Sequence, residues 1–195
     1  MFSASWISCW IGFGGNEPQT PLLFDRALSL LAAHPDVKLL RCSALYRTEP
    51  ISPLPQPDYL NGVCQLTSQL PPLDLLLLLQ AIELELGKLP KPADAPRPID
   101  LDLLFYGSLC CESEKLGLPH PRLWQRRFVL QPLSDLVDSV DLMGSEADPR
   151  PYRVVLASLL PAVSMQRLEE VPFLDRQQLC PHWVEWELSQ VIESR

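Results

Sequence analysis

The sequence predicts an α+β protein, a two-layer sandwich in which two helices cover one face of an antiparallel sheet. Three observations predict this fold. Short runs of aromatic and β-branched residues alternate with longer apolar runs in the order strand, helix, strand, strand, helix, strand. Glycine and proline mark the ends of these runs. The chain has 195 residues, enough for one domain with a sizeable core.

The composition excludes several classes of function. The net charge of −8 argues against a nucleic-acid partner, because binding to a phosphate backbone requires a basic face. The six cysteines show no CxxC pair and no zinc-like spacing, so we expect reduced thiols and a cytoplasmic protein. The apolar run at residues 6–13 is too short for a membrane span or a signal peptide, so we expect no membrane partner.

The first two elements are a strand at residues 6–13 and a helix that begins at Thr20 and Pro21. Thr20 is the expected N-cap, Pro21 suits the first helical position, and the helix ends at His34. Between them, residues 14–16 read Gly-Gly-Asn and predict a turn. No Gly-Lys-Ser/Thr follows the glycines, so the turn is not a phosphate-binding loop of the Walker type.

Two further strands, residues 37–46 and 59–67, flank a proline-rich loop. Asn61 lies on the more polar face of the second of these strands. It is either a solvated residue or an amide that recognises the edge of a bound heterocycle. Tyr59 belongs to the core or its rim by default, but an aromatic ring at the mouth of a strand can stack on a flat ligand. For both residues the two interpretations stay open.

The second helix covers residues 74–86 and ends at Gly87, which adopts left-handed backbone geometry at little cost. Gln80 and Glu83 lie three residues apart on one face of its final turns. By default these two side chains form a solvated helix surface.

The fourth strand contains Asp100 and Asp102 within an apolar run. Side chains alternate along a strand, so both carboxylates point to the same side. Such a pair is costly to bury unless a cation neutralises it, and a divalent metal would do so. Arg97 and Lys88, in the proline-rich loop just before, add cationic groups, and Arg97 has a fork of donors suited to phosphate. An exposed edge strand is the alternative, but the order of elements favours a central or near-central strand.

Basic residues gather after His120, at Arg122, Arg126 and Arg127, where a polyphosphate would need them. A histidine beside prolines is more often a capping or packing residue than a catalyst.

Beyond this cluster, residues 130–137 and 154–160 predict short helices, and residues 144–153 are polar and rich in turns. Residues 183–192 have apolar spacings that are only partly helical. They form either a structural cap over the sheet or a surface for self-association.

The chain resembles the 6-hydroxymethyl-7,8-dihydropterin pyrophosphokinases of folate biosynthesis from about residue 7 to residue 136. The resemblance rests on six blocks: Phe13 to Asn16, Tyr46 to Thr48, Gln56 to Asn61, Gln80 to Glu83, Pro96 to Leu104, and Pro119 to Phe128. It implies a ferredoxin-like α+β sandwich with a βαββαβ core and additional C-terminal helical elements. Residues 1–144 would form the pyrophosphokinase domain, and residues 145–195 an extension packed on or beside it.

The resemblance also implies an enzyme that transfers the β,γ-diphosphate of ATP to a reduced pterin and releases AMP, using two Mg²⁺ ions. Asp100 and Asp102 would hold both ions and, with Arg97 and Lys88, form the catalytic group. The pterin would contact Thr48, Tyr59, Asn61 and Phe128. ATP would contact Gln80, Glu83, Arg97, Lys115, His120 and Arg126. ATP and the reduced pterin are the partners expected, and protein partners are left unknown.

The loop before the fourth strand departs from the family pattern, which begins Gly-Arg-x-Arg. Here Lys88 keeps a positive charge without the bidentate fork, and Pro90 removes a cation. Weaker loop closure and slower turnover are therefore expected. A degenerate homologue that binds pterin, nucleotide or a protein without catalysis is the alternative. A nucleic-acid-binding ferredoxin-like domain is a third hypothesis, which the charge balance opposes.

Overall fold

The computed structural model describes residues 5–51, 55–90, 95–144 and 150–192. The mixed α/β fold with an antiparallel sheet is confirmed, whereas three strands rather than the predicted two lie between the first two helices. The elements up to residue 106 are β1 (Ile7–Gly15), α1 (Thr20–Ala33), β2 (Val37–Cys42), β3 (Tyr46–Thr48), β4 (Tyr59–Ser68), α2 (Pro72–Glu85) and β5 (Asp100–Tyr106). The expected strand at residues 37–46 is divided into β2 and β3, and between them the hydroxyl of Ser43 accepts the backbone N–H of Val63 at 2.9 Å. Residues 91–94 of the second proline-rich loop lie outside the described residues.

The second half of the chain is irregular and differs more from expectation. Its elements are β6 (Cys111–Glu112), β7 (Gly117–Leu118), η1 (Leu123–Gln125), α3 (Arg127–Ser134), β8 (Ser139–Leu142), β9 (Tyr152–Val155), η2 (Leu156–Ser158), η3 (Leu160–Val163), β10 (Leu168–Glu170), α4 (Phe173–Leu179) and α5 (Pro181–Ile192).

The short helix expected at residues 130–137 is present, but it begins at Arg127 and ends at Ser134. Two other local predictions were wrong. The helix expected at residues 154–160 is instead the end of β9, where Val154 pairs with Val140, followed by two short 3₁₀ helices. Thr20 is the first residue of α1 rather than its N-cap, and its hydroxyl donates to the Pro98 carbonyl at 2.8 Å.

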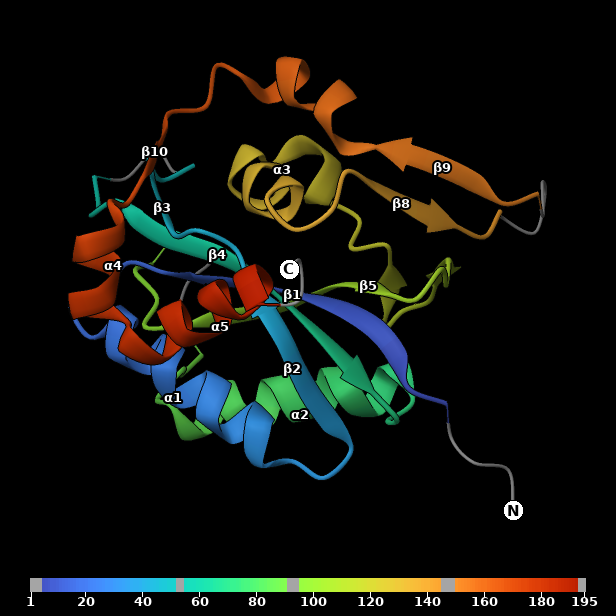
Figure 1. Ribbon diagram of the computed structural model, residues 1–195, viewed down its shortest axis with the longest axis horizontal. Coiled ribbons are helices and arrows are strands. Elements are labelled where there is room, and N and C mark those ends of the chain that lie inside the picture. Colours follow the sequence, from blue (N-terminus) through green and yellow to red (C-terminus); the bar gives the residue numbers. More distant parts are fainter. Residues whose placement is uncertain (1–4, 52–54, 91–94, 145–149, 193–195) are drawn as a thin grey trace.

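The main sheet has the order β10–β3–β4–β1–β5 (Figure 1). β2 also pairs with β4: β3 pairs with residues 59–61 of β4, and β2 with residues 64–68. All strand pairs among the described residues are antiparallel. Within the described chain β5 therefore lies at the edge of the sheet, and the expectation that the aspartates occupy a central or near-central strand was wrong. The backbone N–H of His120 donates to the Leu104 carbonyl at 3.0 Å and covers part of this edge.

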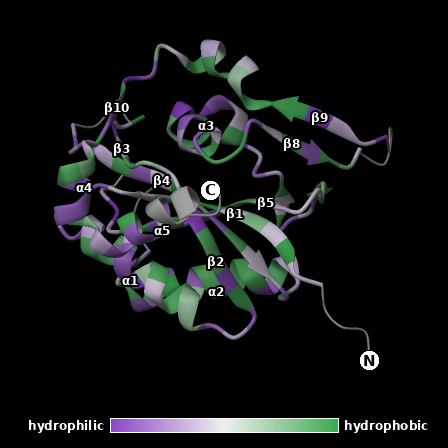
Figure 2. Ribbon diagram, in the orientation of Figure 1, coloured by the Kyte–Doolittle hydropathy of each residue, from purple (hydrophilic) through white to green (hydrophobic). Residues whose placement is uncertain are grey.

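Two hydrophobic cores lie on opposite faces of the sheet. On one face α1, α2 and α5 pack against residues such as Ile11 and Leu66. On the other face α3 and the β8–β9 hairpin pack around Phe105 and Leu130. Figure 2 shows α2 as largely hydrophobic, and Leu77 remains exposed on it. No helix in the described ranges is both long and apolar enough to cross a lipid bilayer.

The end of the chain forms a regular helix, α5, packed on β2 and α1. Trp183 is fully buried, and its indole N–H donates to the Ser43 carbonyl at 2.8 Å. Gly62 makes room for this ring, because a Cβ at that position would lie 2.5 Å from the Trp183 ring. Residues 183–192, whose apolar spacing is only partly helical, therefore belong to one continuous helix.

Candidate active site

A cavity of about 710 Å³ lies over the sheet between β1, β3, β4, β5 and the start of α3. It brings together residues that are far apart in the sequence. Nine of the predicted site residues line it: Thr48, Tyr59, Asn61, Lys88, Arg97, Asp100, Asp102, Arg126 and Phe128. The predicted pterin group and the predicted metal and phosphate group thus share one cavity.

Glycines form the floor of the cavity beside the two aspartates. Gly14 pairs with Asp100 and Gly12 pairs with Asp102 across the β1–β5 ladder. Gly14 also pairs with Asn61 on the other side, where a Cβ would lie 3.1 Å from the Asn61 Oδ1 atom. Asn61 and Asp100 are therefore two strand spacings apart, about 10 Å, with no side chain between them. One ligand can reach both.

The Gly-Gly-Asn stretch is not the predicted turn, because Gly14 and Gly15 are the last residues of β1. Asn16 follows them and is 6% exposed. Its Oδ1 atom accepts the N–H of Arg97 at 2.8 Å, and its amide nitrogen donates to Gln56 Oε1 at 2.9 Å. Asn16 therefore connects the two proline-rich loops on either side of the cavity.

The two aspartates are neutralised by nearby cations. Lys88 Nζ lies 2.7 Å from Asp100 Oδ1, and Arg97 Nη1 lies 3.6 Å from the same oxygen. Arg126 Nη1 lies 3.6 Å from Asp102 Oδ2. Burial acts to lower the pKa of Lys88, but its bonds to carboxylates outweigh burial and raise that pKa. Positive charge is thus concentrated around the carboxylates of an acidic protein.

The donor set suits a magnesium ion that is shared with a substrate. Among the described residues there is no group of three or more His, Cys, Asp or Glu side chains that could hold a metal. Mg²⁺ binds through one or two carboxylates together with waters and substrate phosphates. Asp100 and Asp102 line the cavity side by side and fit that requirement.

The opposite end of the cavity combines amide groups with aromatic rings. The Asn61 amide nitrogen donates to Thr48 Oγ1 at 2.8 Å, and both residues are 4% exposed. Tyr59 lines this end from β4, and Phe128 lines it from α3. The guanidinium of Arg126 lies over the Phe128 ring at 5.4 Å from its centroid, which links the aromatic end to the charged end.

Four predicted ATP-binding residues, all within the described chain, do not line the cavity: Gln80, Glu83, Lys115 and His120. Gln80 and Lys115 are exposed. Glu83 is buried, and its Oε1 atom accepts the N–H of Leu101 at 2.6 Å and pairs with Lys88 at 2.7 Å. Burial is the main cause that raises the pKa of Glu83. It also lowers the pKa of His120, whose Nδ1 atom accepts the N–H of Arg122 at 3.3 Å.

Several residues that line the cavity were not assigned to the site from the sequence: Gln56, Gln125, Val129 and Gln166. Gln56 and Gln125 lie inside blocks that carry the family resemblance, so a signal for them was present. Arg122, from the basic cluster expected at a polyphosphate, also lines the cavity. Gln166 had no such signal, because the chain after about Gly144 lies mostly outside the resemblance.

Comparison with known proteins agrees with the geometry. A profile of the family described as 7,8-dihydro-6-hydroxymethylpterin-pyrophosphokinase (HPPK) matches residues 10–138. The 2-amino-4-hydroxy-6-hydroxymethyldihydropteridine pyrophosphokinase of Pseudomonas aeruginosa is 35% identical over 163 residues, which is 84% of this chain and 96% of that protein. The protein of the same name from Synechocystis is 40% identical over 132 residues, 67% of each chain.

Solved structures show the same fold at low identity. The HPPK-DHPS protein of Plasmodium falciparum, wild type with SDX-DHP, superposes with a TM-score of 0.59 at 14% identity. The superposition covers 83% of this chain and 45% of that one, so the chain spans less than half of the Plasmodium protein. Since the family profile matches well over half of the sequence, the chain belongs to the 7,8-dihydro-6-hydroxymethylpterin-pyrophosphokinase family.

Proposed function

We propose that the cavity between β5 and α3 is the active site of an ATP-dependent pyrophosphokinase of folate synthesis. The family transfers diphosphate from ATP to the hydroxymethyl group of a dihydropterin. One observation carries the assignment to this cavity: Asn61 and Asp100 lie across Gly14 with no side chain between them. A pterin bound at Asn61 can therefore present its hydroxymethyl group toward a phosphate held near Asp100.

Asp100 and Asp102 are proposed to hold two Mg²⁺ ions. Bound magnesium would neutralise negative charge on the phosphate oxygens and on the pterin hydroxyl. Arg97 and Arg126, which line the cavity next to the aspartates, are proposed to bind the same phosphates. Lys88 is proposed to move from Asp100 to a phosphate oxygen when the substrates are in place.

The reaction requires no nucleophile from the protein. The pterin hydroxyl oxygen forms a bond to the β-phosphorus of ATP and loses its proton. The bond from that phosphorus to the bridging oxygen breaks, and AMP leaves with the oxygen. The protein contributes by holding the two reactants in line and by balancing their charge.

The pterin is proposed to lie between the rings of Tyr59 and Phe128. Both line the same end of the cavity, and a flat heterocycle is a suitable partner for two aromatic rings. Asn61 and Thr48 would bind its polar edge, since amide and hydroxyl groups match the donors and acceptors of the ring. This supports a reduced pterin as the acceptor.

The predicted ATP contacts that do not line the cavity are proposed to act in two other ways. Glu83 is proposed to act through Lys88, because its carboxylate holds that ammonium beside Asp100. Gln80, Lys115 and His120 remain proposed contacts of the nucleotide base and ribose, which extend beyond the phosphates.

The setting of the enzyme is also part of this proposal. The six cysteines are free thiols, which supports a reducing, cytoplasmic location. The net charge of −8 supports the absence of a nucleic-acid partner. The position of β1 between β4 and β5 supports a ferredoxin-like core. We also propose that residues 1–144 form the pyrophosphokinase domain and that residues 145–195 form an extension packed on or beside it.

Formation of AMP tests the proposal. The protein is incubated with Mg²⁺, ATP and 6-hydroxymethyl-7,8-dihydropterin, and AMP is measured over time. We expect AMP from the wild type and a rate on the order of 100-fold lower from Asp100→Asn, because a proposed metal ligand that balances charge in the transition state is lost. Asp141→Asn, which alters an exposed carboxylate of β8 away from the cavity, is the control. A wild type that binds both substrates and releases no AMP would instead identify the degenerate homologue.

A further inference from the structure

The segment at residues 164–168, called the strap below, crosses the aromatic end of the cavity. It connects η3 to β10, and Figure 1 shows it passing from beside α3 to the edge of the sheet. Leu168 pairs with Thr48, so the strap continues as a strand next to β3. The strap lies beyond residues 10–138, the part of the chain that the family profile matches.

Gln166 attaches the strap to one wall of the cavity. Its side-chain Nε2 atom donates to the Gln125 carbonyl at 2.9 Å, and its Oε1 atom accepts the N–H of Arg127 at 2.7 Å. Arg127 returns the contact, because its Nη1 atom donates to the Gln166 carbonyl at 2.8 Å. These bonds fix the backbone on both sides of Arg126 and directly before Phe128.

Arg167 attaches the strap to the opposite wall. Its Nη2 atom lies 2.7 Å from both carboxylate oxygens of Asp58, and its backbone N–H donates to Glu49 Oε1 at 3.1 Å. Asp58 directly precedes Tyr59, and Glu49 directly follows Thr48. Arg167 therefore holds both ends of the proline-rich loop at residues 49–58.

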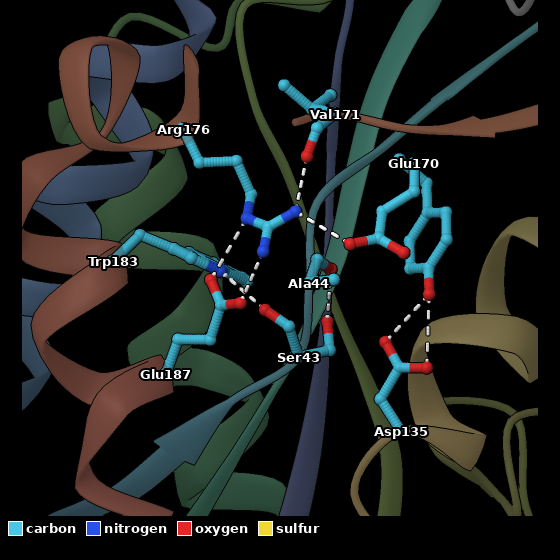
Figure 3. Close-up of polar contacts among 9 residues, drawn as sticks. Ser43, Ala44, Asp135, Glu170, Val171, Arg176, Trp183 and Glu187 are labelled. Atoms are coloured by element: carbon cyan, nitrogen blue, oxygen red, sulfur yellow. Dashed lines mark hydrogen bonds and ion pairs between the residues drawn. The ribbon is translucent and has the colours of Figure 1, made fainter. Parts of the chain in front are cut away.

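The chain after the strap is firmly held. The N–H of Val171 donates to the Leu45 carbonyl at 2.8 Å. Arg176 is 4% exposed, donates to Glu170 Oε1 at 2.9 Å and to the Val171 carbonyl, and pairs with Glu187 at 2.6 Å (Figure 3). The strap is thus held at both of its ends, by the start of α3 on one side and by β10 and the Arg176 network on the other.

We propose that Gln166 and Arg167 are positioning residues that set the separation between Tyr59 and Phe128 for the pterin. This inference rests on the proposed function, in which those two rings hold the pterin. The Arg167–Asp58 pair is largely exposed, so it contributes little to global stability. Loss of this pair should instead weaken pterin binding, because the ligand would then have to order the segment around Tyr59 when it binds, and this ordering costs affinity.

Steady-state kinetics of Gln166→Ala and Arg167→Ala test the proposal. We expect KM for the pterin to rise about 3- to 10-fold, the range for ordering a few side chains on binding. For Arg167→Ala, KM for ATP and kcat should stay within about 2-fold of wild type, because Arg167 contacts Glu49 and Asp58 on the pterin side of the cavity, whereas the Gln166 contacts flank Arg126. Arg167→Lys should restore part of the pterin affinity, since one hydrogen bond to Asp58 is regained.

Arg153→Ala is the matched control, because Arg153 forms an exposed pair of the same kind with both oxygens of Asp141 on the β8–β9 hairpin, away from the cavity. The proposal is overturned if Arg153→Ala raises KM for the pterin as much as Arg167→Ala does. It is also overturned if Arg167→Ala leaves that KM unchanged or raises KM for ATP equally. Fluorescence titration with 6-hydroxymethylpterin gives the same test from dissociation constants, even if the wild type releases no AMP.

Discussion

Lys88 Nζ lies 2.7 Å from Asp100 Oδ1, so an ammonium group binds the carboxylate that is proposed to hold Mg²⁺. The same ammonium lies 2.7 Å from Glu83 Oε1, which is buried behind β5. Lys88 therefore neutralises Asp100 when no metal is bound. A metal that binds Asp100 competes with this lysine, and the released lysine is then available to a phosphate.

Removing the ammonium should strengthen the binding of Mg²⁺ alone. We expect Lys88→Gln to bind Mg²⁺ about 2- to 5-fold more tightly in the absence of nucleotide, the factor that one partly exposed ion pair supplies. KM for MgATP should rise in the same variant, because a cation near the phosphates is lost. Isothermal titration calorimetry measures the first effect and AMP formation the second.

Arg153→Gln, which makes the same change in net charge on the β8–β9 hairpin, controls for long-range electrostatics. If Lys88→Gln weakens Mg²⁺ binding, competition between the lysine and the metal is wrong.

The aromatic rings should contribute to pterin binding and not to ATP binding. We expect Tyr59→Ala and Phe128→Ala to raise KM for the pterin about 5- to 150-fold, since stacking of a base on an aromatic side chain supplies about 1–3 kcal/mol. Tyr59→Phe should remain near wild type, because it keeps the ring and loses a contact of 3.5 Å between the hydroxyl and Gln56 Oε1. A Tyr59→Phe variant as defective as Tyr59→Ala would show that the hydroxyl, not the ring, binds the pterin.

The sequence predicted those features that local pattern determines. Alternation along residues 100–106 placed Asp100 and Asp102 on one side of a strand, and both line the cavity. The neighbours of that strand could not be read in the same way, because strand pairing is set by contacts between distant segments. The aspartates in fact lie on an edge strand. They are still not simply solvated, because Lys88 and Arg126 form ion pairs with them in the cavity.

The C-terminal part of the site could not be predicted for the same reason. Gln166 and Arg167 are ordinary polar residues in an irregular stretch, and their contacts to Gln125 and Asp58 span 41 and 109 residues of sequence. The helix predicted at residues 154–160 was wrong at its start for a different reason. Val154 and Val155 are two β-branched residues in an apolar run, which suits a short strand as well as a helix.

Glu83 should make stability depend on pH. Its pKa is raised, chiefly by burial, above the ordinary value of 4.5. The folded protein therefore binds its proton more tightly than the unfolded chain does. Its contribution to the free energy of unfolding is full below the unfolded pKa and is lost as the pH rises through the raised folded pKa.

The side chain in Glu83→Gln stays neutral at every pH, so this variant should not lose stability through the titration of residue 83. We expect the free energy of unfolding of the wild type, relative to the variant, to decrease as the pH rises from the unfolded pKa through the raised folded pKa of Glu83. Urea denaturation at several pH values measures it. Glu85→Gln, which removes an exposed carboxylate from the same helix, controls for the loss of one charge. Parallel pH profiles of wild type and Glu83→Gln would contradict the prediction.

Asn16 should affect both stability and the binding of both substrates. In Asn16→Ala the N–H of Arg97 loses its side-chain acceptor, and Gln56 and the Pro57 carbonyl lose their donor. Loss of partners for buried polar groups costs about 1–3 kcal/mol, so the free energy of unfolding should fall by that amount in urea denaturation. Because Asn16 holds the loops at both ends of the cavity, KM should rise for ATP and for the pterin together.

Asn16→Asp distinguishes the contact of Asn16 with Arg97 from its contacts with Gln56 and Pro57. It keeps the acceptor for the N–H of Arg97 but replaces the donor with a carboxylate oxygen. Gln56 can rotate its amide to donate to that oxygen, whereas the Pro57 carbonyl cannot adapt. We therefore expect Asn16→Asp to retain the affinity for ATP better than the affinity for the pterin. Equal losses for the two substrates would show that Asn16 stabilises β1 rather than the two loops individually.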